Sequence, residues 1–158
     1  MSKIVDAGDS APDFDLAGDG ARRVALAALK GRKVVVYFYP KDATSGCTAE
    51  AIAFNALRGE FEAAGATIVG MSPDSAASHD KFKTKYELGF ALASDTDKTV
   101  LDAYGVWKEK SMYGRKYMGV ERTTFLIGAD GKIARVWRKV KVPGHAQEVL
   151  AAAKALAT

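Results

Sequence analysis

The sequence predicts a mixed β-sheet with helices on both faces, an α/β or α+β fold. Up to residue 105, short apolar runs that suit buried strands alternate with segments of helical spacing. After that, two strand-like runs flank the turn sequence GADG, which is typical of a β-hairpin. An amphipathic segment at the C-terminus predicts a last helix. The expected order is β-α-β-α-β-α, a hairpin and a helix.

The first strands and the first helix have clear limits in the sequence. The opening GDSAPDFDL is rich in turn residues and continues into a short edge strand, where apolar residues alternate with acids. An unbroken apolar and β-branched run at 34–39 predicts a central strand covered on both faces, and Pro40 ends it. Helical spacing extends over 48–64, and Gly65 is placed to end that helix.

The middle of the chain repeats this alternation. A second buried strand is predicted at 67–71, followed by a helix on which Phe82 and Tyr86 share a face. The run FALASD at 90–95 predicts a third strand. A short helix is expected at 97–105, where a glycine closes it.

The last third of the chain holds the hairpin and the final helix. The two hairpin strands are predicted at 122–127 and 132–138, and the helix at 144–157. The stretch KEKSMYGRKYMG, at 108–119, is the least regular part, so we expect a mobile loop there.

Length and composition indicate one domain over 1–158. The chain has 48% hydrophobic and 27% charged residues, an ordinary globular profile, and it is long enough to bury a single core. A single cysteine cannot form an internal disulfide. One cysteine and two histidines are too few for an ordinary zinc site, so we expect no metal and no cofactor.

Charge and hydropathy exclude other classes. The net charge is +4, but basic and acidic residues are interleaved, and the densest basic cluster, 135–141, alternates like a strand with one solvated face. We therefore do not expect nucleic-acid binding. No apolar stretch approaches the roughly 18 residues that span a bilayer, and the start lacks a signal-peptide pattern. We expect a cytoplasmic protein without membrane contact.

The only cysteine, Cys47, lies where a buried strand gives way to a helix. By residue type alone, a lone cysteine is most often an inert core residue. Its position in the first helical turn favours reactivity instead, because free N–H groups and the helix dipole stabilise a thiolate. Ionisation alone gains only about thirtyfold in rate, so donors must also stabilise the attacked atoms. The Thr44 hydroxyl is one candidate, and Gly46 permits close backbone approach.

The sequence around this cysteine resembles a known family. The pattern P-x-x-x-T-x-x-C, formed by Pro40, Thr44 and Cys47, resembles the active-site motif of peroxiredoxins. The surrounding VVVYFYPKDATSGCTAEA is similar to the peroxiredoxin Q, or bacterioferritin comigratory protein, subgroup. The similarity covers nearly the whole chain, through GDSAPDFDL, LKGRKVVVYFYP, FALASD, GVWKEKSMYG and GVERTTFLIGADGKI.

This resemblance implies a thioredoxin-like fold with an N-terminal hairpin extension, and the reduction of hydrogen peroxide or organic hydroperoxides. Cys47 would attack the peroxide and become a sulfenic acid. The Thr44 hydroxyl would hold a peroxide oxygen, and Pro40 would roof the pocket. The N–H groups of Gly46 and Cys47 would stabilise the breaking O–O bond.

Two charged residues gain a role only through the resemblance. Arg122 corresponds to the arginine that the family places over the active-site sulfur, and nothing in its local pattern distinguishes it among 23 basic residues. Glu50 matches an acidic position that orients such an arginine. An acid that merely favours a helix N-terminus is an equally good reading of Glu50.

The chain departs from the family in lacking a second, resolving cysteine. Ile52 and Lys83 stand where relatives carry it, so the resemblance implies a one-cysteine mechanism completed by an external thiol: glutathione, thioredoxin or glutaredoxin. Ser45 replaces a common proline, which predicts a looser loop. Without a partner cysteine to reach, the first helical turn is expected to be comparatively static.

The other residues that could take part in catalysis or binding are interpreted as structural. His79 and His145 are expected at the surface or at helix starts. Trp107, Tyr39 and Phe38 are expected in the core or in a pocket wall.

Two alternative functions stay open at this point. One is a thioredoxin-fold enzyme that uses Cys47 for glutathione exchange, and the other is a redox-sensing or holdase module. The subgroup implies a monomer, with a role in antioxidant defence and redox homeostasis.

Overall fold

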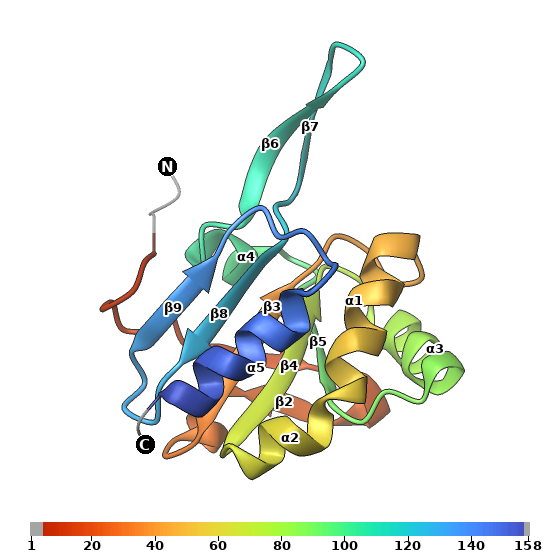
Figure 1. Ribbon diagram of the computed structural model, residues 1–158. Helices are drawn as coiled ribbons and strands as arrows, with labels where there is room; N and C mark the ends of the chain where they lie inside the picture. Colours follow the sequence, from red (N-terminus) through yellow and green to blue (C-terminus); the bar gives the residue numbers. More distant parts are fainter. Residues whose placement is uncertain (1–4, 157–158) are drawn as a thin grey trace.

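A mixed five-stranded sheet forms the centre of the computed structural model, which describes residues 5–156. The strand order is β5-β4-β3-β8-β9 (Figure 1). Three neighbouring strands are parallel: β3 (Lys33–Phe38), β4 (Ala66–Ser72) and β5 (Ala91–Ser94). The predicted hairpin adds two antiparallel strands, β8 (Thr123–Ile127) and β9 (Ile133–Trp137).

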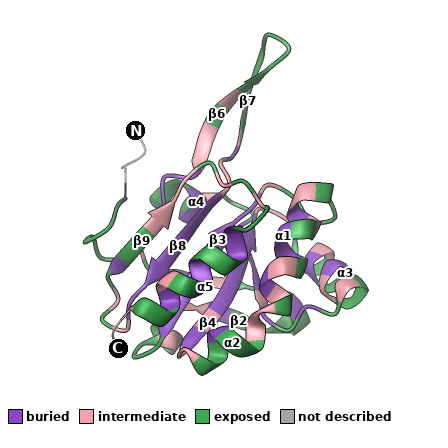
Figure 2. Ribbon diagram, in the orientation of Figure 1, coloured by how far each residue is buried: buried purple, intermediate pink, exposed green. Residues whose placement is uncertain are grey.

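The central strand β3 is buried on both faces, as its continuous apolar run predicts (Figure 2). Because side chains alternate along a strand, β3 supplies two separate cores. Val35 and Tyr37 belong to the first core, which also contains Cys47. Val34 and Val36 belong to the second core.

The helices form layers on the two faces. The first face carries α1 (Ser45–Ala56), α2 (Arg58–Ala63) and α5 (His145–Ala155), whose buried residues fill the first core (Figure 1). The helix α3 (Ala76–Tyr86) contacts β5 and adds Phe82 to the same core. The second face is covered by α4 (Thr99–Ala103) and by the N-terminal hairpin of β1 (Asp15–Ala17) and β2 (Arg23–Ala25).

Two 3-10 helices, η1 (Asp19–Ala21) and η2 (Leu26–Leu29), flank β2. None of the helices in residues 5–156 is both long enough and apolar enough to cross a membrane.

The prediction of one helix over 48–64 needs correction. The helix begins earlier, at Ser45, and is interrupted at Leu57, where the backbone leaves helical geometry (φ −99°, ψ 3°). The interruption separates α1 from α2, and both helices still direct apolar side chains to the same core.

The prediction of an irregular loop at 108–119 is wrong. This stretch forms a two-stranded hairpin of β6 (Trp107–Met112) and β7 (Arg115–Val120). The turn residues Tyr113 and Gly114 both have positive φ, 52° and 76°, which suits the tight turns of two-residue hairpins. The hairpin leaves the body of the molecule (Figure 1), so most of its residues are exposed and no apolar alternation marks it.

Candidate active site

Cys47 lies in the first turn of α1 with Thr44 as the residue before the helix. The strand β3 ends at Phe38, and the connection 39–44 brings the chain to the helix N-terminus at the same end of the sheet. The cysteine is 1% exposed and is a free thiol. Its sulfur is therefore covered by protein, but it lies beside the unpaired N–H groups that begin every helix.

Arg122 reaches this sulfur from the start of the strand that neighbours β3. Its Nη2 lies 3.3 Å from Cys47 Sγ, and its Nη1 donates to Glu50 Oε1 at 2.6 Å. Arg122 directly precedes β8, the neighbour of β3 in the sheet, and its carbonyl accepts from the N–H of Val140 at 3.0 Å. The guanidinium is thus fixed by both its backbone and a carboxylate.

Glu50 lies one helical turn after Cys47, so both side chains face the same way. The carboxylate is 1% exposed, and its Oε2 has no hydrogen-bond partner among the described residues. Burial raises the pKa of Glu50 to about 7, although Arg122 pulls it down. The same carboxylate and Cys47 raise the pKa of Arg122 despite the opposing effect of its burial. The arginine therefore stays charged at the sulfur.

The raised pKa of Glu50 predicts a pH-dependent stability. Because the folded protein holds this proton up to about pH 7 and the unfolded chain only to about 4.5, the contribution of Glu50 to stability is full below pH 4.5 and is lost as pH rises through 7. Glu50→Gln should remove this loss, which amounts to about 3 kcal/mol. Chemical denaturation of both proteins at a series of pH values measures the difference. Glu60→Gln, at an exposed acid of α2, should show no such difference.

Gly46 makes room for the guanidinium. A Cβ atom at this position would lie 3.2 Å from Arg122 Nη2, so any larger residue would press the arginine away. Thr44 donates its hydroxyl to the carbonyl of Lys41 at 2.9 Å and does not cap the helix. Pro40 is half-buried in the same connection. The structure therefore brings Cys47, Gly46 and Arg122 into contact, and it places Thr44 and Pro40 on the adjoining loop without a hydrogen bond to the sulfur.

A buried ion pair holds that loop, and sequence reasoning missed it. Asp42 Oδ1 accepts from the Tyr39 hydroxyl at 2.6 Å, and its Oδ2 accepts from the Ser78 hydroxyl at 2.8 Å and lies 2.7 Å from His79 Nδ1. The other ring nitrogen of His79 lies 2.9 Å from the carbonyl of Ala93. Both partners of the ring are acceptors, an arrangement that favours the doubly protonated imidazolium of His79. These bonds fix the loop that precedes the cysteine to α3.

The surroundings raise the pKa of His79. Its burial opposes the charge, but Asp42, the carbonyl of Ala93 and the nearby Asp74 favour it. The network also offsets local strain, since Ala43, next to Asp42, has a φ of 66°, a conformation that costs alanine about 1 kcal/mol.

The prediction of surface or helix-start positions is wrong for His79, which is buried within α3, and is confirmed for His145, which begins a helix. His145 is the first residue of α5, is buried, and has its Nε2 2.8 Å from the Thr124 hydroxyl. Burial lowers the pKa of His145 to about 4. Tyr39 and Phe38 are fully buried, as expected.

The positions where relatives carry a second cysteine have other roles in this structure. Ile52 is exposed on α1. Lys83 on α3 binds the buried carboxylate of Asp19 at 2.6 Å and so ties α3 to η1. At this position the chain therefore carries a lysine with a structural role in place of a second thiol.

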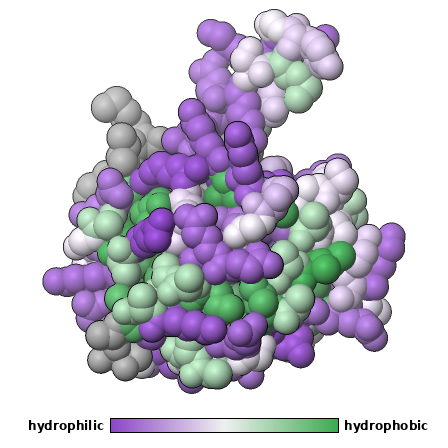
Figure 3. Space-filling view, viewed as in Figure 1, coloured by the Kyte–Doolittle hydropathy of each residue, from purple (hydrophilic) through white to green (hydrophobic). Residues whose placement is uncertain are grey.

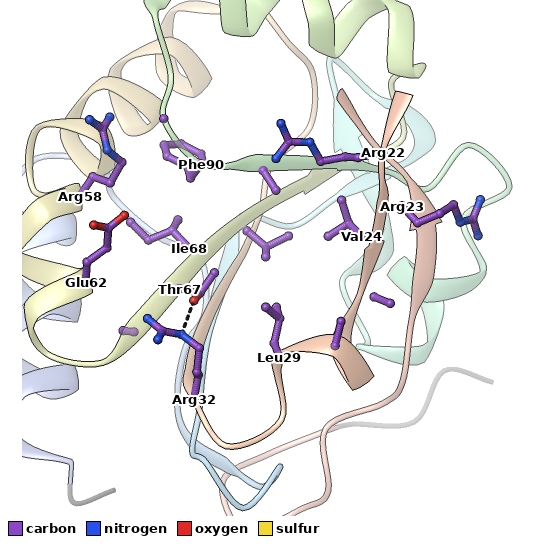
Figure 4. Close-up of a pocket in the computed structure, with 16 residues that line it drawn as sticks. Arg22, Arg23, Val24, Leu29, Arg32, Arg58, Glu62, Thr67, Ile68 and Phe90 are labelled. Carbon is purple, nitrogen blue, oxygen red and sulfur yellow. Dashed lines mark hydrogen bonds between the residues drawn. The ribbon is translucent and has the colours of Figure 1, made fainter. Parts of the chain in front are cut away.

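A cavity of about 620 Å³ lies elsewhere on the molecule (Figure 4). Val24, Ile68 and Phe90 are among its apolar lining residues, and Arg32 at its edge donates to the Thr67 hydroxyl at 3.0 Å. None of the six candidate site residues lines it. Within residues 5–156, no group of three or more histidine, cysteine and carboxylate side chains could hold a metal ion.

Comparisons with known proteins agree with the resemblance of the sequence. The model of the AhpC/TSA family matches residues 7–136. Peroxiredoxin Bcp of Xanthomonas campestris is 50% identical over 143 residues, which cover 90% of this chain and 89% of the relative. Peroxiredoxin Bcp of Bacillus subtilis is 46% identical over 146 residues, with 92% and 93% of the two chains covered.

Solved structures confirm the thioredoxin-like fold. Peroxiredoxin Q of Xanthomonas campestris superimposes with a TM-score of 0.89 at 46% identity and 98% coverage of both chains. A structure of the bacterioferritin comigratory protein of the same organism, obtained to understand its alkyl peroxide reduction, gives a TM-score of 0.88 at 45% identity and the same coverage. This chain therefore belongs to the AhpC/TSA family, as a one-cysteine peroxiredoxin of the Bcp, or peroxiredoxin Q, group of thiol-dependent peroxidases.

Proposed function

We propose that this chain reduces hydrogen peroxide and organic hydroperoxides through a sulfenic acid on Cys47, with an external thiol as the final reductant. The contact of Arg122 Nη2 with Cys47 Sγ at 3.3 Å is the observation that carries the proposal. A guanidinium at this distance stabilises a thiolate over a thiol, and it remains in place for the charge that develops on the peroxide.

In the oxidative step the Cys47 thiolate attacks one peroxide oxygen. An S–O bond forms, the O–O bond breaks, and the second oxygen leaves as alkoxide or hydroxide and takes a proton from water. The sulfur is oxidised by two electrons and the peroxide is reduced by two. Arg122 and the N–H groups of Gly46 and Cys47 stabilise the developing charge, and the Thr44 hydroxyl orients the peroxide.

The other assigned residues shape this step. Pro40 limits the access of water to the pocket. Glu50 is a positioning residue, because its contact with Nη1 leaves Nη2 directed at the sulfur.

In the reductive step the thiolate of an external reductant attacks the Cys47 sulfenic sulfur. An S–S bond forms, the S–O bond breaks, and the oxygen leaves as water after protonation. A second thiol then attacks the reductant's sulfur of the mixed disulfide and releases the Cys47 thiolate. Because Cys47 is 1% exposed, we infer that the first turn of α1 opens before the reductant attacks, which departs from the static turn that the missing second cysteine led us to expect.

We further propose that residues 1–158 form a single domain that acts as a monomer in the cytoplasm, in antioxidant defence and redox homeostasis. The packing of α5 into the same core as α1 supports a single domain.

Oxidation by one equivalent of peroxide tests the proposed chemistry. We expect intact-mass spectrometry to show one added oxygen atom on Cys47, or a mixed disulfide when a thiol is present. A dimer linked through Cys47, or oxidation confined to methionine, would contradict the one-cysteine scheme.

A further inference from the structure

We propose that the β6–β7 hairpin is the docking surface for the thiol protein that reduces Cys47, and that this partner is an acidic protein that carries a pair of thiols. The inference rests on the proposed peroxidase function and names the class of partner for its reductive step. It follows from the charge on the two faces of the hairpin and from the position of the hairpin beside Arg122.

The strand register sorts the side chains of the hairpin into two faces, because residues directly opposite one another share a face and side chains alternate along each strand. We call one of them the basic face; its members are Lys108, Lys110, Met112, Arg115, Tyr117 and Gly119. The opposite face carries Trp107, Glu109, Ser111, Lys116, Met118 and Val120.

Within the part of the chain that the structure describes, only the basic face of the hairpin carries cations without an acidic partner. On the opposite face, Lys116 pairs with Glu109 at 3.7 Å. On the basic face, Lys108 pairs with Glu121 at 2.9 Å, but Lys110 and Arg115 form no salt bridge with any residue of 5–156. An acidic partner surface would complement these two cations.

The basic face also offers apolar contact area. A Cβ on Gly119 would lie 3.2 Å from Lys110 Cδ and 3.4 Å from a ring carbon of Tyr117, so the missing side chain lets the lysine stem and the ring lie over the strand. Met112 and Tyr117 are exposed, and Tyr113 at the tip is 97% exposed. Figure 3 shows hydrophobic atoms near this tip among hydrophilic ones. Aromatic and methionine side chains beside arginine are typical of protein interfaces.

The hairpin stands close to the reacting sulfur. Its second strand ends at Val120, two residues before Arg122, and the N–H of the intervening Glu121 donates to the Val106 carbonyl at 2.8 Å. At its base, Val120 and Trp107 pack into the second core, so the basic face there turns to the side of the sheet that carries Cys47. In Figure 1 the hairpin rises from the end of the molecule where α1 begins.

Attraction between the basic face and an acidic partner would speed only the reductive step, because only that step involves a protein reductant. A negatively charged thiol protein is attracted to the hairpin, which raises its encounter rate, and salt weakens the attraction. Its thiolate then forms the S–S bond with the Cys47 sulfenic sulfur while water leaves, and its second thiol closes its own disulfide and releases Cys47. A small peroxide or a small thiol needs no such surface.

The test compares two reductants on one charge-neutralised enzyme. Lys110→Gln/Arg115→Gln removes the two unpaired cations, and Lys30→Gln/Lys132→Gln removes the same number of exposed charges at the opposite end of the sheet, where β3 begins. Turnover is measured with an acidic thioredoxin, kept reduced by its reductase and NADPH, and with dithiothreitol. We expect kcat/KM for thioredoxin to fall roughly tenfold in the first variant at low salt, and the difference to shrink at high salt. Dithiothreitol turnover and Cys47 oxidation by peroxide should be unchanged.

Three outcomes overturn the proposal: an equal loss in the Lys30/Lys132 control, an equal loss with dithiothreitol, or no thioredoxin turnover by a wild-type enzyme whose Cys47 is oxidised normally. If peroxide fails to oxidise Cys47 in the wild-type enzyme, the proposed function itself fails, and the direct measurement of that first step distinguishes the two failures.

Discussion

Cys47→Ser is expected to abolish peroxide reduction, with a loss of more than about a thousandfold, while the protein stays folded. The hydroxyl of serine is a far weaker nucleophile than a thiolate, and no other cysteine exists to replace it. Serine is close to cysteine in size, so the first turn of α1 should pack as before. Peroxide consumption with dithiothreitol as reductant measures the loss, and circular dichroism checks the fold.

The matched control for this variant is Ser45→Ala, two residues earlier in the same turn. Ser45 is exposed and begins the helix, so its replacement changes the helix start without touching the sulfur. We expect nearly full activity from it. Appreciable peroxidase activity in Cys47→Ser would rule out the sulfenic acid mechanism.

Arg122→Ala is expected to slow the oxidation of Cys47 roughly 100- to 1,000-fold, the usual effect of removing one donor that stabilises a developing negative charge. The variant loses the 3.3 Å contact with Sγ and leaves Glu50 buried without its partner. A loss of stability should accompany the slower chemistry above about pH 7, where Glu50 would have to ionise while buried and unpaired. Rapid-quench alkylation of the unreacted thiol measures the rate.

Two further variants separate chemistry from stability. Arg122→Ala/Glu50→Gln should recover the stability lost above pH 7 without recovering the rate, since it removes the buried acid but restores no donor at the sulfur. Arg32→Ala, at the edge of the distant cavity, removes an arginine that contacts Thr67 and should leave the rate unchanged. An unchanged rate in Arg122→Ala would mean that another group stabilises the thiolate.

The parts of the fold that were predictable from sequence are those where burial leaves a local pattern. The apolar runs at 34–39 and 67–71 match β3 and β4 because both faces of these strands are covered. The β6–β7 hairpin escaped prediction because its two faces are mostly solvated, so polar residues occupy both. Its turn, with a tyrosine at positive φ, also lacks the usual asparagine or aspartate.

The candidate site also has one part that local sequence predicts and another that it does not. The place of Cys47 in a helical first turn can be read from local sequence. The partner of its sulfur cannot, because Arg122 is 75 residues away and resembles every other arginine in its local pattern. The pair of Asp42 and His79 spans 37 residues, and a buried ion pair of this kind leaves no periodic signal.

The most direct test of the central claim is the second-order rate of Cys47 oxidation by hydrogen peroxide in the wild-type enzyme, compared with that of a small free thiol at equal thiolate concentration. Since thiolate content is matched, any excess comes from the donors around the sulfur. We expect the enzyme to be faster by a factor of a thousand or more, on the order of the 4 kcal/mol that such donors supply. Equal rates would show that this arrangement of arginine, glutamate and helix N-terminus does not activate peroxide.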